Sequence, residues 1–299
     1  MKTVLLTGAS GFLGRVLLNE MTHKHKVITL GRRESDIAWI IPQPLNPLPP
    51  VDCVVHAAGL AHQMRAKPNA DAAMMTINDA GTRLLLKALE VNPPRQFVFI
   101  STVAVYGRDE GENIDESHPL NGVSAYARSK IAAEKAVLAW GAFHNVHTLV
   151  LRLPLIAGVN PPGNLAAMIR AIRKRYYVRI GKGTSRKSMV GARAVASFIA
   201  GLKGNESGVY NLTDGVHPTV SAIEVRMAQQ LKRRVKSVPL GLAAAMGRIG
   251  DRLPASPVNT MRIRKLTGTL TFSDEKARSE LNWKPDTALN ELMINEKNL

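Results

Sequence analysis

The sequence is poor in cysteine and in aromatic residues. Its single cysteine, Cys53, excludes an intramolecular disulfide and any metal site built from several cysteines, which fits a reducing compartment. Only 5% of the residues are Phe, Trp or Tyr, and a surface that binds single-stranded nucleic acid needs aromatic side chains among its basic ones. We therefore expect a cytoplasmic protein with no nucleic-acid partner.

Long apolar runs are also missing. The longest stretch with few charges, residues 238–246, is far shorter than the roughly 20 residues of a membrane-spanning helix. Residues 1–6 are too short for the apolar part of a signal peptide and lead directly into a glycine-rich turn, so they are interpreted as a first strand. These features predict no membrane span, although they do not exclude a helix that lies on a membrane surface.

Acidic residues are scarce as well. The chain has 23 Asp and Glu against 40 Lys and Arg, a formal charge of +17, and no acidic residue lies between residues 135 and 205. Such a balance points to polyanionic partners or phosphorylated ligands. Most of the basic residues in that span are interpreted as a solvated face.

Short apolar runs alternate with segments of helical periodicity over the first half of the chain. The predicted strands are residues 2–6, 27–30, 52–56, 96–101 and 147–152, and the predicted helices are residues 12–21, 72–91 and 124–142. This alternation predicts an α/β fold with a Rossmann-type, doubly wound parallel sheet. The proline-rich residues 42–50 predict an irregular connection where a crossover helix is expected.

The alternation weakens after Pro154. Residues 165–175 and 221–234 are predicted helices, with a short strand at residues 210–212. We predict a nucleotide-binding domain over residues 1–155 and a smaller C-terminal α/β substrate lobe over residues 156–299, some segments of which cross back into the first domain.

A glycine-rich turn joins the first strand to the first helix. The turn reads Thr7-Gly8-Ala9-Ser10-Gly11-Phe12-Leu13-Gly14. Its three glycines allow a tight turn, a close approach of backbone to a pyrophosphate, and close packing of the helix, whose N-terminus faces the phosphate charge. The predicted cofactor-binding residues here are Gly8, Ser10, Gly11, Phe12, Leu13 and Gly14.

The end of the second strand indicates which dinucleotide binds. An NAD-selective site carries an acidic residue there to bind the ribose hydroxyls, whereas this sequence has Arg32 and Arg33. Two guanidinium groups suit a 2′-phosphate. We therefore predict NADP(H) as the cofactor, with NAD(H) as the alternative.

Tyr126 and Lys130 lie four residues apart on a predicted helix, so their side chains share one face. A nearby ammonium favours the phenolate of a tyrosine, which suits the tyrosine to proton transfer with a substrate oxygen. Thr102 follows the fourth strand at the sheet edge where ligands of α/β proteins bind, and its hydroxyl can donate a hydrogen bond to the same oxygen.

With these residues in order, the chain resembles the extended short-chain dehydrogenases of the NAD-dependent epimerase/dehydratase type. The resemblance includes the glycine turn, the segment Asp52-Cys53-Val54-Val55-His56-Ala57-Ala58, Asn78, Val105-Tyr106-Gly107, Arg152-Leu153-Pro154 and Leu281-Asn282-Trp283-Lys284-Pro285. It implies that Thr102, Tyr126 and Lys130 are catalytic and that Lys130 also holds the nicotinamide ribose.

The resemblance implies further binding residues. Those that line the cofactor site are Ala57, Ala58, Gly59, Asn78 and Pro154. Asn164 resembles the residue that contacts the substrate diphosphate, and Arg186 and Lys187 resemble the basic diphosphate clamp, with the register between the two left open. Residues 265–268 are expected to close the nucleotide pocket.

Two departures from the family pattern narrow the function. Val103 and Ala104 stand where the sugar 4,6-dehydratases carry an Asp-Glu pair, so dehydration lacks its acid and base. Residues 190–193 stand where the family often has a His-Val-Asp-like segment, so the resemblance does not define the substrate-binding edge of the site. We predict NADPH-dependent reduction of a 4-keto nucleotide sugar, UDP-linked, in bacterial surface-polysaccharide biosynthesis.

Several alternatives remain open at this point. One is an NAD-dependent nucleotide-sugar 4-epimerase, and another is a reductase of a non-sugar ketone. A dinucleotide sensor or RNA-binding relative has no need of the Tyr126 and Lys130 pair. No metal site is predicted, because His23, His25 and His62 lack neighbours at metal-ligand spacing. A homodimer is one alternative for the oligomeric state.

Overall fold

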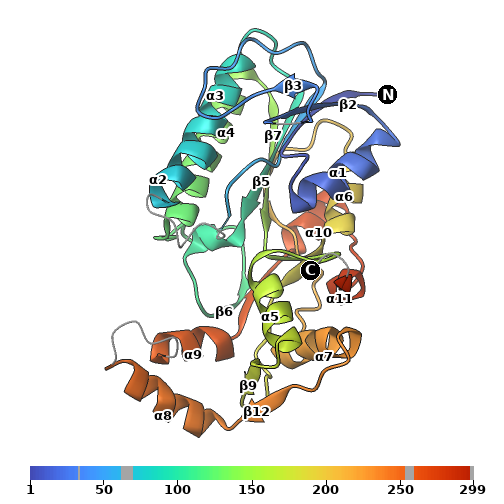
Figure 1. Cartoon of the computed structure of the whole chain (residues 1–299). Helices are drawn as coiled ribbons and strands as arrows, with labels where there is room; N and C mark the ends of the chain where they lie inside the picture. The colour runs from blue at the N-terminus through green and yellow to red at the C-terminus, as the bar shows by residue number, and fades with distance from the viewer. Residues whose placement is uncertain (33, 62–69, 253–258, 297–299) are drawn as a thin grey trace.

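The structure is a computed structural model that describes residues 1–32, 34–61, 70–252 and 259–296. Its centre is a seven-stranded sheet in which every pair of neighbouring strands is parallel (Figure 1). Across the sheet the order is β11 (Gly208–Asn211), β7 (His147–Leu153), β5 (Gln96–Thr102), β4 (Cys53–His56), β1 (Thr3–Thr7), β2 (Lys26–Gly31) and β3 (Ile37–Ala38). The predicted α/β fold with a parallel, Rossmann-type sheet is confirmed.

Successive residues of β1 face opposite sides of the sheet, as the pleat of a strand requires. Val4 and Leu6 pack in the core beneath α1 (Phe12–Thr22) and α6 (Ala192–Ala200). Leu5 packs in the other core, beneath α3 (Gly81–Ala88) and α4 (Ala125–His144). Figure 1 shows these helices in two layers with the sheet between them. Alternate residues of this one strand therefore contribute to two separate cores on opposite faces of the sheet.

The helix predicted over residues 72–91 differs from a regular α-helix in its middle. It consists of α2 (Ala70–Met75), a π-helical turn over Thr76–Ala80, and α3. The side chain of Asn78, within that turn, bonds both backbone groups of Leu60 and the hydroxyl of Ser129. These long-range bonds give a physical reason for the wider turn, and wide turns of this kind are common at functional sites.

Residues 39–52, all of them described, contain no helix or strand between β3 and β4. The prediction of an irregular connection at residues 42–50 is thus confirmed. Trp39 and Leu48 are buried there, and Trp39 Nε1 donates to the carbonyl of Gln43 at 2.9 Å. The connection therefore covers its part of the sheet with side chains instead of a helix.

The remaining elements lie below the sheet and beside its lower half in Figure 1. Three small parallel sheets pair β8 (Leu155–Ala157) with β10 (Met189–Gly191), β9 (Val178–Ile180) with β12 (Lys236–Val238), and β13 (Leu270–Phe272) with β6 (Gly111–Ile114). The helices of this part are α5 (Gly163–Arg173), α7 (Val220–Gln230), α8 (Leu240–Gly250) and α9 (Thr260–Thr267), followed by α10 (Glu275–Leu281) and α11 (Ala288–Glu291).

Three segments that follow residue 156 belong to the central body: β11 extends the main sheet, α6 packs on α1, and α10 contacts β11. The domain division near residue 155 stays a prediction. Across the described part of the chain, no helix has both the length and the apolar character needed to cross a bilayer.

Candidate active site

The glycine-rich turn between β1 and α1 leaves no room for side chains. A Cβ on Gly8, which has φ of +76°, would lie 2.6 Å from the amide nitrogen of Ala58. A Cβ on Gly14 would lie 1.9 Å from the carbonyl oxygen of Gly8. The bare backbone at these positions, with the N-terminus of α1 behind it, forms a cradle that fits a dinucleotide pyrophosphate.

Residues of the loop after β4 lie against this turn. The amide of Ala58 donates to Thr7 Oγ1 at 3.1 Å, and the Gly8 backbone approaches Ala57 and Ala58. A Cβ on Gly59 would lie 3.1 Å from Asn78 Oδ1 and 3.6 Å from Lys130 Nζ. The structure therefore brings the cofactor residues predicted in the glycine turn, the β4 loop and Asn78 to one place beside Lys130.

At the carboxyl end of β5, Thr102 caps the 3₁₀ turn Val103–Tyr106, its Oγ1 accepting from the amide of Ala104 at 3.2 Å. Burial raises the pKa of the half-buried Tyr126 phenol, and a side-chain hydrogen bond with Thr102 opposes that rise. The two hydroxyl groups are therefore within hydrogen-bonding reach. Pro154 follows Leu153, which pairs with Thr102 in the sheet, so it lies at the same edge.

Lys130 is buried one helical turn further along α4. Its ammonium donates to the carbonyl of Ile100 at 2.7 Å and lies 4.4 Å from the centroid of the Phe99 ring. Burial lowers the pKa of Lys130 to about 8, while the nearby carboxylate of Glu134 raises it. The group is thus a cation held beneath the loop that carries Gly59, with a pKa close to neutral.

Glu134 is the site residue that the sequence-based prediction missed. It lies on α4 four residues after Lys130 and is buried, with 1% of its surface exposed. Ser101 and Arg152 both bond its carboxylate, the guanidinium at 2.7 Å. The repeat of Tyr126, Lys130 and Glu134 at intervals of four was the available signal, since it places all three on one helix face.

Behind Glu134 the polar contacts continue away from the site. Arg152 Nη1 donates to the phenol of Tyr106 at 3.0 Å, and this phenol donates to Asn211 Oδ1 at 2.8 Å. These contacts join β7, the turn after β5, and β11. Because breaking a buried ion pair leaves an uncompensated charge, the network fixes the strand ends that carry Thr102.

The residues predicted to select the cofactor follow β2. Arg32 is exposed and comes directly after Gly31, the last residue of the strand. Arg33 lies outside the described residues. The structure thus places Arg32 at the sheet edge where the adenosine ribose of a dinucleotide would lie.

The predicted substrate residues are spread over the other side of the site. Asn164 is exposed in the first turn of α5. Arg186 Nη1 donates to the carbonyls of Val216 and His217, at 3.3 and 3.5 Å.

The adjacent side chain points to a different partner. Lys187 Nζ donates to the carbonyl of Lys265 on α9 at 3.2 Å. Arg186 and Lys187 therefore diverge, as neighbours in an extended segment do, and they do not form a joint clamp in this structure.

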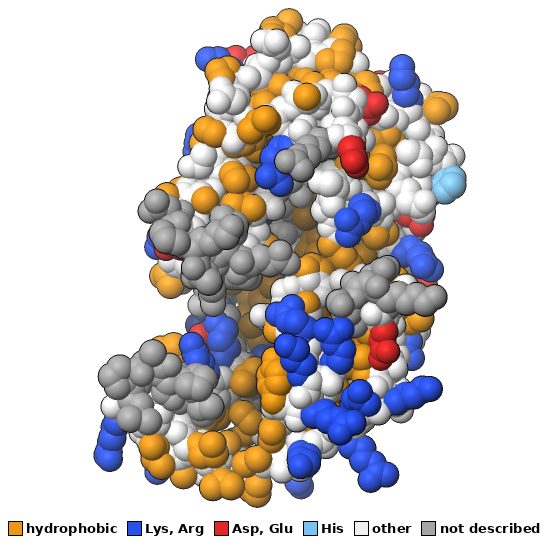
Figure 2. All heavy atoms as spheres, in the orientation of Figure 1, with side chains coloured by type: hydrophobic (Ala, Val, Ile, Leu, Met, Phe, Trp, Pro, Cys, Tyr) orange, Lys and Arg blue, Asp and Glu red, His pale blue; other side chains and the backbone are white. Residues whose placement is uncertain are grey.

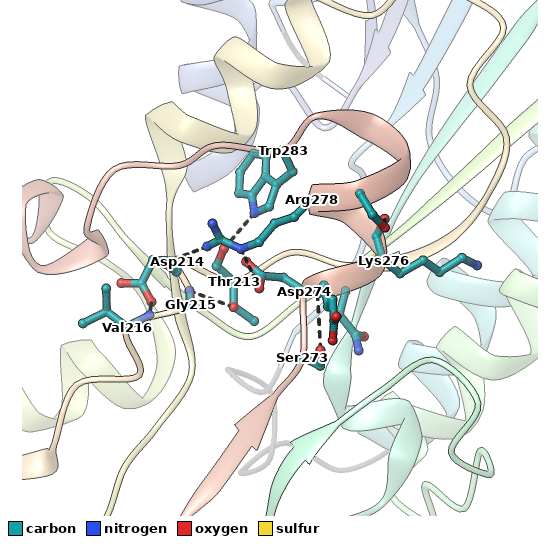
Figure 3. A network of polar contacts seen from close by, with 12 residues as sticks. Thr213, Asp214, Gly215, Val216, Ser273, Asp274, Lys276, Arg278 and Trp283 are labelled. Atoms are coloured by element: carbon teal, nitrogen blue, oxygen red, sulfur yellow. Dashed lines mark hydrogen bonds and ion pairs between the residues drawn. The ribbon is translucent and has the colours of Figure 1, made fainter.

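A polar network in Figure 3 fixes the loop that Arg186 contacts. The carboxylate of Asp214 accepts from the amides of Val216 and Ala288, and Arg278 donates to the Asp214 carbonyl at 3.1 Å. Trp283, from the terminal motif noted in the sequence, donates to the carbonyl of Thr213 at 2.8 Å. The C-terminal segment thus acts as a support for the substrate side of the site.

Comparisons with known proteins identify the family of this chain. A family model described as the NAD dependent epimerase/dehydratase family matches residues 4–212. An N-acetyl-alpha-D-glucosaminyl-diphospho-ditrans,octacis-undecaprenol 4-epimerase of Escherichia coli O157:H7 is 28% identical over 301 residues, which cover 92% of this chain and 88% of that protein.

A second relative carries out a different reaction. The 4-hydroxy-2-methyl-3-oxo-4-farnesyl-3,4-dihydroquinoline-1-oxide ketoreductase of Stigmatella aurantiaca is 28% identical over 310 residues, covering 93% of this chain and 90% of that protein. Among solved structures, RMD from Pseudomonas aeruginosa complexed with NADPH aligns with a TM-score of 0.67 at 21% identity, over 97% of this chain and 96% of that chain.

Proposed function

This chain belongs to the NAD dependent epimerase/dehydratase family, and from that membership we propose that it reduces the keto group at C4 of a diphosphate-linked sugar with NADPH. The observation that carries the proposal is that the hydroxyl groups of Thr102 and Tyr126 lie within hydrogen-bonding reach of each other at the sheet edge, with the ammonium of Lys130 buried one helical turn further along α4. A hydroxyl pair in this position can hold a carbonyl oxygen and protonate it.

The residues divide the chemistry in a simple way. NADPH, when bound in the glycine cradle, supplies the hydride that adds to C4. Tyr126 gives its phenolic proton to the O4 oxygen, and the C=O group becomes CH–OH. A pKa raised by burial keeps this phenol protonated, which is the form that a reduction consumes.

Two neighbours assist the phenol. Thr102 Oγ1 donates to O4 and fixes the direction of proton transfer. The Lys130 cation stabilises the phenolate that remains, so the proton can be replaced from solvent for the next turnover.

The choice of a reductase depends on the cofactor. A reductase consumes one hydride in each turnover, whereas an epimerase returns the hydride to the sugar and regenerates its cofactor. Arg32 stands where an NAD-selective site has a carboxylate. This supports NADP(H), with NAD(H) as the alternative cofactor.

The carrier of the sugar is a diphosphate, which a basic side chain such as Arg186 would bind. In our proposal the carrier is UDP. The Escherichia coli relative is named for a sugar linked to undecaprenyl diphosphate. A basic diphosphate site therefore fits two carriers, UDP and a polyprenyl diphosphate. A 4-keto sugar has to be supplied by a separate dehydratase, because Val103 and Ala104 cannot act as acid and base. Surface-polysaccharide biosynthesis is the role that we propose for the product.

The names of two relatives support two alternative functions. The 4-epimerase name of the Escherichia coli protein favours epimerisation at C4. The ketoreductase name of the Stigmatella protein favours reduction of an apolar ketone. Reduction of an apolar ketone does not need a basic diphosphate site.

The test is an assay of NADPH oxidation with a 4-keto-6-deoxy sugar, linked to UDP in one arm and to a short polyprenyl diphosphate in the other. Stoichiometric loss of NADPH in one arm supports reduction and identifies the carrier. Interconversion of two C4 epimers without loss of NADPH would replace the proposal with the epimerase. Turnover of an apolar ketone alone would replace it with the third candidate.

A further inference from the structure

Exposed apolar side chains gather in one part of the molecule. Nine of the seventeen large apolar side chains that face solvent among the described residues lie in residues 176–178 and 225–266, less than a sixth of the chain. They are Tyr176, Val178, Val225, Leu240, Leu242, Met246, Ile249, Met261 and Leu266. Large exposed apolar patches mark interaction sites.

Helix α8 contributes the most continuous stripe. Leu242, Met246 and Ile249 recur at intervals of four and three residues, so they share one face, and they are 56%, 49% and 62% exposed. The small residues Ala243 and Gly247 are buried on the neighbouring face, about a quarter turn around the helix. At Gly247 the packing against α9 is so close that a Cβ would lie 2.6 Å from Ile263 Cδ1. The helix is therefore fixed by its small face and presents its large apolar face outward.

The charge around this stripe is predominantly positive. Residues 225–273 contain a single acidic residue, Asp251, whose carboxylate is bonded by the amide and hydroxyl of Thr260. The same segment contains ten basic residues: Arg226, Lys232, Arg233, Arg234, Lys236, Arg248, Arg252, Arg262, Arg264 and Lys265. Two of them, Arg264 and Lys265, pair with Glu110 and Asp109. Among the described residues, Lys236, Arg248 and Arg252 form no ion pair.

The apolar and basic residues belong to one continuous end of the molecule. Strand β12, which leads into α8, pairs with β9, so Lys236 lies opposite Val178. Figure 1 shows β9, β12, α8 and α9 together at the end of the molecule farthest from β3. In Figure 2 apolar side chains cover the lower edge of this end, with basic side chains above and beside them.

We propose that this end, with the exposed face of α8 at its centre, docks on the surface of an anionic phospholipid bilayer. Leu242, Met246 and Ile249 would enter the boundary between headgroups and acyl chains. Arg248 and Arg252 would remain at the phosphates, where their long side chains can reach while the apolar face is immersed. A helix of 11 residues, about 16 Å long, lies in the plane of the membrane and does not cross it.

Charge separates this occupant from the others. A second copy of the chain that docked through the same end would bring like charges together across the contact, because residues 225–273 contain ten basic residues and one acidic residue. A nucleic acid would match the charge but would leave the three apolar side chains of α8 without a partner. Tyr176 is the only aromatic residue among the nine exposed apolar ones, too few for base stacking along a strand. An anionic bilayer satisfies both the charge and the apolar stripe.

Docking would also orient the active site. Helix α9 is tied to the loop after the Thr102 turn by the pairs of Arg264 with Glu110 and of Lys265 with Asp109. It also accepts a bond from Lys187, the neighbour of Arg186. The substrate side of the site would therefore face the membrane. The inference goes beyond the proposed function and does not depend on it, since its test measures binding to lipid alone.

The test is flotation of the purified full chain with vesicles of phosphatidylcholine, with and without phosphatidylglycerol. We expect binding only to the vesicles with phosphatidylglycerol, and loss of binding at high salt. The triple variant Leu242→Ser, Met246→Ser, Ile249→Ser should bind more weakly by roughly tenfold or more. The double variant Arg248→Ala, Arg252→Ala should lose about fivefold for each charge removed.

Matched controls come from outside residues 176–178 and 225–266. Val123→Ser with Phe143→Ser removes two side chains that are 79% and 83% exposed, and Lys24→Ala with Lys26→Ala removes two exposed charges. Both should bind like the wild type, and circular dichroism should show all variants folded. Equal binding by the α8 variants and the controls would overturn the proposal. So would a loss, in the triple variant, of self-association that the wild type shows without lipid, since that result would identify a second copy as the occupant.

Discussion

Nδ1 of His56 lies 2.6 Å from Oγ1 of Thr7, and the other ring nitrogen of His56 lies 2.9 Å from Oγ1 of Thr82. Thr82 donates its proton to the carbonyl of Asn78, so it accepts from Nε2–H, and Nδ1 accepts from Thr7. The Thr7 hydroxyl in turn accepts from the amide of Ala58. A neutral histidine thus connects the cofactor loop to the π-helical turn beneath the sheet edge.

This relationship predicts acid sensitivity. Burial, together with the charge of Lys130, lowers the pKa of His56 to about 3 from an ordinary 6.5. Below about pH 6.5 the unfolded chain binds a proton that the folded chain does not take up until about pH 3, so stability falls as the pH falls through this window. The contribution of one such group is about 1.4 kcal/mol for each pH unit.

The pH-dependent contribution of His56 to stability is measured by urea unfolding at neutral and mildly acidic pH. The His56→Asn variant, which cannot be protonated there, should show a smaller difference between the two conditions than the wild type. The exposed His23 provides the control, since His23→Asn should leave the difference unchanged. Parallel pH dependence in the wild type and His56→Asn would contradict a neutral, buried His56.

Replacing Tyr126 with Phe should remove most of the turnover and leave NADPH affinity nearly unchanged. The variant loses the proton donor but keeps the ring and the cradle, and general acid catalysis is typically worth about 10²–10⁴-fold. Stopped-flow rates and NADPH fluorescence titration give the two quantities. Tyr176→Phe, at an exposed position, is the matched control. A Tyr126→Phe enzyme with more than about half of the wild-type rate would refute the acid role.

Removing both guanidinium groups after β2, as Arg32→Ala with Arg33→Ala, should weaken NADPH much more than NADH. A charged hydrogen bond contributes about 1.5–3 kcal/mol, so the loss for NADPH is expected to be roughly tenfold or more. The dissociation constants of both cofactors should be measured for this variant and for Lys24→Ala with Lys26→Ala. Equal losses for the two cofactors would show that Arg32 and Arg33 do not bind the 2′-phosphate.

The divergence of Arg186 and Lys187 predicts that only one of them binds the substrate diphosphate. Lys187 is half-buried and already bonds the carbonyl of Lys265, and burial lowers the pKa of its ammonium. Arg186 is exposed, and among the described residues only its Nη1 donates from the side chain. Arg186→Ala should therefore raise KM for a nucleotide sugar by roughly tenfold or more, with kcat nearly unchanged.

Lys187→Ala serves as the comparison in that experiment and should leave KM near the wild-type value. Its effect should instead be a lower melting temperature, because the contact with α9 is lost. A larger rise in KM for Lys187→Ala than for Arg186→Ala would reverse the assignment.

The sequence alone determined the features that depend on local order. The alternation of strands and helices, the glycine turn, and the spacing of Tyr126 and Lys130 are set by side-chain periodicity and backbone freedom, and these act over a few residues. The parallel sheet follows from them, because a strand, a helix and the next strand have one favoured handedness.

Only the tertiary structure decided which distant groups meet. The π-helical turn at Asn78 depends on contacts with Leu60 and Ser129, and the burial of Glu134 on α4 depends on Arg152 from strand β7. Whether the apolar face of α8 packs inward or faces solvent depends on where α9 lies, and no periodicity within the helix contains that information. These outcomes are fixed by long-range contacts, whose partners lie from 18 to 51 residues apart in the cases of Glu134 and Asn78.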